Sequence, residues 1–208
     1  MMDRSRFERA ESLPDFAARA VQNHDLWVGT LKRAALAPEH AARAAALPGR
    51  WHVVVLLEDW CGDAVNTVPF LHRLADATPG VTLRVLERDR NLDLMDAHLS
   101  NGARAIPLAI VYDELFVERG QWGSRPAVLQ QWVREHGLAM EKDARYKQVR
   151  TWYARDKGVT TVEEMLSLLE GIAGDVIAAS RPADDVTTSP APVPETPVLA
   201  TPSADAPY

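Results

Sequence analysis

The chain has one cysteine, no long hydrophobic run and no block of basic residues. The single cysteine, Cys61, excludes an intramolecular disulfide and fits a reducing compartment. The longest apolar run, Val53 to Leu57, is far too short to span a bilayer, and the charged segment 1–16 argues against an ordinary secretory signal. The net charge of -6 argues against a nucleic-acid partner, because phosphate contacts need clustered Lys and Arg. We therefore expect a cytoplasmic protein that binds neither membranes nor nucleic acids.

Apolar residues make up 47% of the 208 residues, which is enough for a sizeable core. Residues 3–47 have apolar side chains at helical spacing and predict two or three helices, with Pro14 and Pro38 in first turns. The β-branched run 52–57 predicts a strand buried on both faces. After a tight turn, an amphipathic helix is expected to end before Pro79.

The downstream pattern predicts a second strand, a short helix, a hairpin and three more helices. In order, these are expected at residues 81–86, 93–99, 107–112 with 116–121, a helix opened by Ser124 and Pro126, a helix at about 140–156, and one from Thr160, where Glu163 and Glu164 offer capping boxes. We interpret 1–48 as a helical extension packing on the core, 49–137 as the core and 138–180 as C-terminal helices. The last segment, 181–208, is predicted to be a disordered proline-rich tail.

The turn after the first strand contains the string Trp60-Cys61-Gly62-Asp63-Ala64. Pro69 lies eight residues after Cys61, and Ile106-Pro107 opens the predicted hairpin. Over residues 51–136 this order resembles the thioredoxin family, in which the string reads Trp-Cys-Gly-Pro-Cys. The resemblance implies an α/β thioredoxin-like fold: a central mixed four-stranded sheet flanked by helices, here with extra N- and C-terminal helices. More narrowly, the string looks like that of a bacterial single-cysteine group.

Cys61 is the candidate attacking thiol. At the amino end of a helix, unpaired N–H groups and the macrodipole stabilise a thiolate, and such placement lowers a thiol pKa from ~8.5 to roughly 3.5–7.5. Asp63 opposes this effect, because a neighbouring carboxylate raises a thiol pKa. The alternative interpretation is a buried structural cysteine.

Two positions depart from the family pattern. Ala64 stands where the second thiol should be, so a mixed disulfide on Cys61 must await an outside thiol, and independent thioredoxin turnover is excluded. Val55 stands where the resemblance implies a buried Asp that assists proton transfer to that second thiol. Glu58 and Asp59 are candidate bases nearby, although exposed loop carboxylates are more often only solvated.

The resemblance also implies a cis bond before Pro107, which sets the backbone of Ile106 beside Cys61. Such a groove binds an extended peptide by strand addition. Arg104 is expected near the groove, where it meets a carboxylate of a peptide or small thiol, or is only a solvated turn residue. The predicted substrate-binding residues are Trp60, Gly62, Asp63, Arg104, Ile106 and Pro107.

The sequence thus favours a single reactive thiol that forms mixed disulfides with a protein or a low-molecular-weight thiol in redox homeostasis. If the protein is an enzyme, it is a monothiol thiol–disulfide oxidoreductase. The alternative is a non-catalytic thioredoxin-fold module that binds a peptide or protein. A third interpretation is iron–sulfur carriage with a glutathione-type thiol, but the Cys-Gly-Phe-Ser string of monothiol glutaredoxins is not matched. No metal or cofactor is expected, because the six histidines lack ligand spacing. The oligomeric state stays open.

Overall fold

The first strand of the chain lies in the centre of the sheet. In the computed structural model, which describes residues 1–179, β1 (Trp51–Leu57) pairs in parallel with β2 (Val81–Glu87) and antiparallel with β3 (Leu108–Tyr112). The edge strand β4 (Glu118–Gly123) pairs antiparallel with β3, which gives the order β2-β1-β3-β4. This mixed four-stranded sheet confirms the predicted fold class. The predicted tail, 181–208, lies outside the described residues.

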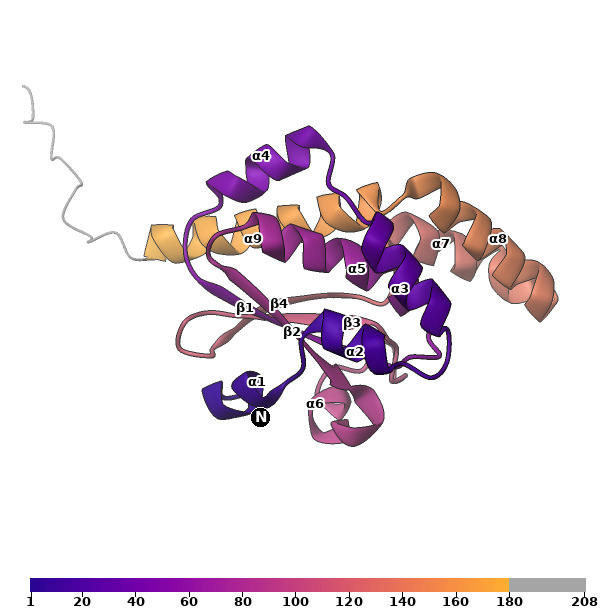
Figure 1. Ribbon diagram of the computed structural model, residues 1–208, viewed down its shortest axis with the longest axis horizontal. Helices are drawn as coiled ribbons and strands as arrows, with labels where there is room; N and C mark the ends of the chain where they lie inside the picture. The colour runs from indigo at the N-terminus through magenta and orange to yellow at the C-terminus, as the bar shows by residue number, and fades with distance from the viewer. Residues whose placement is uncertain (180–208) are drawn as a thin grey trace, which may run out of the picture.

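Helices cover both faces of this sheet, which explains why β1 is apolar without alternation. The side chains from Val53 to Leu57 are at most 1% exposed. Figure 1 shows α4, α5 and α9 on one side of the sheet and α1 and α6 on the other. In chain order the helices are α1 (Arg4–Arg9), α2 (Leu13–Arg19), α3 (His24–Arg33), α4 (Pro38–Ala46), α5 (Gly62–Ala77), α6 (Leu92–Asp96), α7 (Ala127–Glu135), α8 (Lys142–Asp156) and α9 (Val159–Ala179), with 3-10 turns at Arg88–Arg90 and Gly137–Ala139.

The N-terminal segment forms four short helices, where the sequence predicted two or three. The helical spacing of its apolar side chains continues across the boundaries between these helices. The boundaries are therefore set by capping residues and by backbone conformation. Ser12 accepts a hydrogen bond from the Asp15 amide and starts α2, which has Pro14 in its first turn as predicted. Asn23, with a φ of 55°, separates α2 from α3, and Pro38 begins α4.

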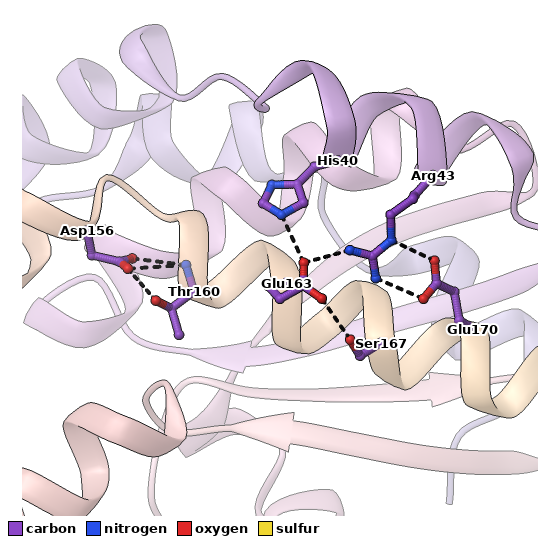
Figure 2. Close-up of polar contacts among 7 residues, drawn as sticks. All are labelled: His40, Arg43, Asp156, Thr160, Glu163, Ser167 and Glu170. Carbon is purple, nitrogen blue, oxygen red and sulfur yellow. Dashed lines mark hydrogen bonds and ion pairs between the residues drawn. The ribbon is translucent and has the colours of Figure 1, made fainter.

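The edge strand and the last helix begin differently from the prediction. β4 runs from Glu118 to Gly123 rather than over 116–121, because the tight turn of the hairpin is completed later, with Phe116 at a φ of 60°. α9 begins at Val159, and its first turn is capped by Asp156, whose carboxylate accepts the Thr160 amide at 3.2 Å (Figure 2). The predicted capping role of Glu163 and Glu164 was therefore wrong.

Those two glutamates make tertiary contacts instead. Figure 2 shows Glu163 of α9 accepting hydrogen bonds from His40 and Arg43 of α4, at 3.0 and 2.6 Å. Arg43 also holds Glu170 with two bonds of 3.0 and 2.9 Å. Glu164 accepts from the Trp122 indole and from the amide of Ala127, both at 2.7 Å. Neighbouring residues of α9 thus hold α4 against α9 and tie the start of α7 to α9 beside β4. Among residues 1–179, no helix is long and apolar enough to cross a membrane.

Candidate functional site

Cys61 lies at the carboxyl end of β1, where a turn delivers the chain into α5. Its amide donates to the Glu58 carbonyl at 3.1 Å, and it is the residue that precedes the first turn of α5. The thiol points towards the loop before β3 and donates to the Ile106 carbonyl at 3.5 Å. The peptide bond between Ile106 and Pro107 is cis. The fold therefore brings Cys61 and Ile106 together across 45 residues of sequence.

The predicted lowering of the Cys61 pKa was wrong. Cys61 is 6% exposed, and burial raises its pKa above the ordinary value of a thiol. The amides of Ala64 and Asp63 at the start of α5 act in the opposite direction, and the charge of Asp63 adds to the increase. Loss of solvent therefore outweighs the helix terminus in setting the Cys61 pKa.

Asp63 stands at the centre of a polar cluster whose other members come from the C-terminal half of the chain. Arg125, which precedes α7, forms an ion pair with its Oδ2 atom at 2.6 Å, and the Tyr153 hydroxyl of α8 donates to Oδ1 at 2.9 Å. The Asp63 and Arg125 side chains are only 12% and 24% exposed. Burial acts to lower the Arg125 pKa, but the charge of Asp63 and its hydrogen bond together raise that pKa above the ordinary value. Burial raises the pKa of Tyr153.

The rim of the site combines an exposed indole with an open helix start. Trp60 is 43% exposed, and the Arg88 guanidinium lies 5.1 Å from the centroid of its ring. Apart from its own helix backbone and its chain neighbours, no atom lies within 4 Å of the position that a side chain on Gly62 would take. Arg104 does not face Cys61 with a free guanidinium, because Asp96 of α6 holds it with bonds of 2.6 and 2.9 Å. Its carbonyl accepts from Arg88 at 3.3 Å.

The two loop carboxylates before Cys61 are not the solvated groups that the sequence predicted. Glu58 is 8% exposed and accepts the Asp89 amide at 2.9 Å; burial raises its pKa. Asp59 accepts the amides of Val21 and Gln22, both at 2.9 Å. Both carboxylates therefore anchor chain segments around the turn, and Asp59 fixes the turn to the N-terminal helices.

A family model described as thioredoxin matches residues 10–145, more than half of the 208-residue chain. The chain belongs to the thioredoxin family. A protein of unknown function from Pseudomonas aeruginosa is similar in structure, with a TM-score of 0.65, 20% identity and coverage of 82% of this chain and 99% of that one. An HIV epitope-scaffold protein has a TM-score of 0.61, 19% identity and coverage of 79% and 95%. At these identities the two structures show the fold alone, and no curated protein matches the sequence at a significant level.

Against the thioredoxin pattern, this site lacks the second thiol and its proton acceptor. Ala64 and Val55, which occupy those positions, are both 0% exposed and packed in the core. The space of the missing groups is thus filled by apolar side chains. Within residues 1–179, no group of three or more His, Cys, Asp or Glu side chains is placed to hold a metal ion.

Sequence reasoning missed Arg125 and Tyr153, which lie 62 and 90 residues from Asp63. One signal pointed towards them. In this chain Asp63 stands where the thioredoxin string has proline, and a carboxylate that is buried beside a thiol needs a partner. The sequence did not say which partner, because the contact depends on how α7 and α8 fold back on the core.

The charges around Cys61 predict a pH profile for its alkylation. We expect the wild-type midpoint to lie above that of a free thiol, since burial raises the pKa. The Asp63→Asn variant should titrate at lower pH, because it removes a negative charge that disfavours the thiolate and leaves the Arg125 charge uncompensated. Iodoacetamide labelling followed by mass spectrometry measures both midpoints.

The matched variant Asp96→Asn, which removes a carboxylate that pairs with Arg104, should leave the midpoint unchanged. An unshifted Asp63→Asn midpoint would contradict the assignment of the charge effect.

Proposed function

We propose that this thioredoxin-family protein uses Cys61 as a single thiol, which forms mixed disulfides with a protein or low-molecular-weight thiol and is released by an external thiol reductant. The observation that carries the proposal is the contact between the Cys61 thiol and the Ile106 carbonyl, 3.5 Å long, at the amino end of α5. This contact supports the proposal, because strand addition of an extended peptide uses backbone groups such as those of Ile106. We further propose that the chain is one of a bacterial group with a single cysteine at this position, and that it acts in the cytoplasm.

The chemistry is a thiol–disulfide exchange. The Cys61 thiol loses its proton to solvent, and the thiolate attacks one sulfur of the partner disulfide. A new sulfur–sulfur bond joins Cys61 to that sulfur, the partner's own disulfide bond breaks, and the second partner sulfur leaves as a thiolate. Since Ala64 has no thiol, a thiol from another molecule must attack the Cys61 adduct and restore the free cysteine. The raised pKa makes the first step slow at neutral pH and faster as the pH rises.

Mass spectrometry of the intact protein tests this proposal. After incubation with oxidised glutathione or a disulfide-containing peptide, we expect one adduct on Cys61 that dithiothreitol removes. The Cys61→Ser variant should form none. Absence of an adduct on the wild-type protein, even at pH 9 and after hours of incubation, would contradict the proposal.

A second candidate is a non-catalytic module that binds a peptide in the groove beside Ile106. The burial of Cys61 and the direction of its pKa shift favour it, because a shielded thiol with a raised pKa suits a binding surface better than a reaction site. The Cys61→Ser variant separates the two candidates. If the link is covalent, the Cys61→Ser variant should no longer bind a partner that is isolated with the wild-type protein. If the groove alone binds the partner, the variant should retain it.

A further inference from the structure

The chain from residue 124 to residue 156 forms a helical hairpin with an apolar core of its own. We refer to this segment, which contains α7 and α8, as the C-terminal hairpin. Its buried side chains pack as a cluster separate from the main core and are flanked by partly buried Trp132 and Trp152; they are Leu129, Val133, Val149 and Tyr153. A unit with its own apolar core can move as one body without opening the main core.

Both ends of the C-terminal hairpin have backbone conformations that favour glycine. Gly123 precedes it with a φ of 145°, and Lys157 and Gly158 follow it with φ values of 53° and 80°. The link that holds it to the thioredoxin-like core near its first end is polar. One pair joins Glu164 to Trp122 and to the start of α7. Gly123 pairs with Leu108 in the sheet and Gly158 lies against the Phe70 ring, so the two ends are fixed points about which the hairpin rotates.

The other polar link is at the site. Arg125 and Tyr153, from the two arms of the hairpin, converge on Asp63 at 2.6 and 2.9 Å. Asp63 is two residues from Cys61, and the charges of Arg125 and Asp63 both act on the thiol. Figure 1 places α7 and α8 at the end of the molecule where α5 begins. The hairpin is therefore fastened beside a cysteine that is only 6% exposed.

We propose that the C-terminal hairpin is a lid over Cys61, and that the Asp63 carboxylate is the latch that keeps it closed. In the closed state the thiol is shielded, and a disulfide substrate reaches it only when Arg125 and Tyr153 release Asp63. This inference rests on the proposed function, since it describes how the reactive thiol becomes accessible. It also explains why an acidic residue lies beside Cys61, where its charge disfavours the thiolate. Asp63 lowers the reactivity of the thiol, but it holds the hairpin closed.

The test is the rate of Cys61 alkylation by iodoacetamide in the full-length protein under native conditions. Dividing each rate by the thiolate fraction, known from the pH midpoint, separates access from ionisation. Removal of a charge-assisted hydrogen bond shifts the closed–open equilibrium about tenfold, so Asp63→Asn should raise the normalised rate about tenfold or more. Tyr153→Phe, which removes one hydrogen bond and keeps the ion pair, should raise it less.

Two controls make the result specific. Asp59→Asn frees the loop between α2 and α3 on the other side of the turn and should leave the normalised rate unchanged. Low urea should accelerate wild-type alkylation only weakly, because opening of the hairpin exposes little surface compared with global unfolding. If Asp63→Asn does not fold, Tyr153→Phe still provides the test.

Three results would overturn the lid. These are an unchanged normalised rate in both Asp63→Asn and Tyr153→Phe, an acceleration by Asp59→Asn as large as that by Asp63→Asn, and a urea dependence as steep as that of global unfolding. Failure of the proposed function gives a different pattern. In that case Asp63→Asn alkylates faster than the wild type, but neither protein forms a mixed disulfide with oxidised glutathione or a disulfide-containing peptide.

Discussion

The Trp27→Ala variant should lose about 3–5 kcal/mol of unfolding free energy, which is a large part of the stability of a domain of this size. Trp27 of α3 is 0% exposed and lies edge-on to Phe16 of α2, with 5.3 Å between ring centroids. Its indole N–H donates to the Asp59 carbonyl at 3.0 Å. Truncation therefore leaves a cavity between the N-terminal helices and removes one of the two donors to the Asp59 carbonyl, the other being the Asn23 side-chain amide at 3.1 Å. Urea unfolding followed by circular dichroism measures the loss.

A Trp27→Phe variant separates packing from hydrogen bonding. It keeps an aromatic ring in the space but removes the N–H donor, so the loss should be about 0.5–1.5 kcal/mol, the range for one hydrogen bond, since Asn23 still donates to the same carbonyl. Equal losses in the two variants would mean that the hydrogen bond to Asp59, and not the volume of the ring, carries the effect. A loss below about 1 kcal/mol in Trp27→Ala would show that the N-terminal helices are not part of the cooperative unit.

The Ala64→Cys variant should change the lifetime of a mixed disulfide on Cys61. Ala64 lies in the first turn of α5, and its amide acts on the Cys61 thiolate. A thiol introduced at this position is therefore close to the Cys61 sulfur. It attacks the Cys61 sulfur of the adduct, forms an internal disulfide and releases the partner as a thiol. Because this step is intramolecular, we expect release without added reductant at least about tenfold faster than in the wild type. Timed mass spectrometry of the adduct measures it.

The matched control is Ala64→Ser, which adds an atom of similar size without a thiol. Ala64 is 0% exposed, so either substitution should cost about 1–3 kcal/mol through overpacking. Adducts that last equally long in the two variants would mean that the introduced thiol cannot reach Cys61. Faster release in Ala64→Cys alone assigns the slow wild-type release to the missing second thiol.

The parts of the fold that depend on local patterning were predictable. The run 52–57 marked a fully buried strand because no alternation of polar and apolar residues interrupts it, and β1 occupies Trp51–Leu57. The turn that ends in Cys61 marked the start of a helix, and α5 begins at Gly62. The positions of Pro14 and Pro38 marked two helix starts correctly, since proline is tolerated in a first turn and breaks a helix interior.

The electrostatics of the site were not predictable from the same sequence. Whether a helix terminus lowers a thiol pKa depends on how much solvent the thiol keeps, and that is a tertiary property. Here, burial of Cys61 reverses the direction of the shift. Likewise, Glu163 and Glu164 had the correct spacing for a capping box, but Arg43 and Trp122 are stronger competitors that only the folded chain brings within reach.

The contact between Arg43 and Glu163 spans 120 residues of sequence, and this separation has a consequence for biosynthesis. While the chain is being translated, α4 emerges from the ribosome long before α9 exists, so the ion-pairing face of α4 stays in water until α9 is made. Glu164 of α9 also accepts the amide at the start of α7. The synthesis of α9 therefore completes the contacts of both α4 and α7. Nascent chains that stop before α9 should therefore be much more sensitive to protease than the finished protein.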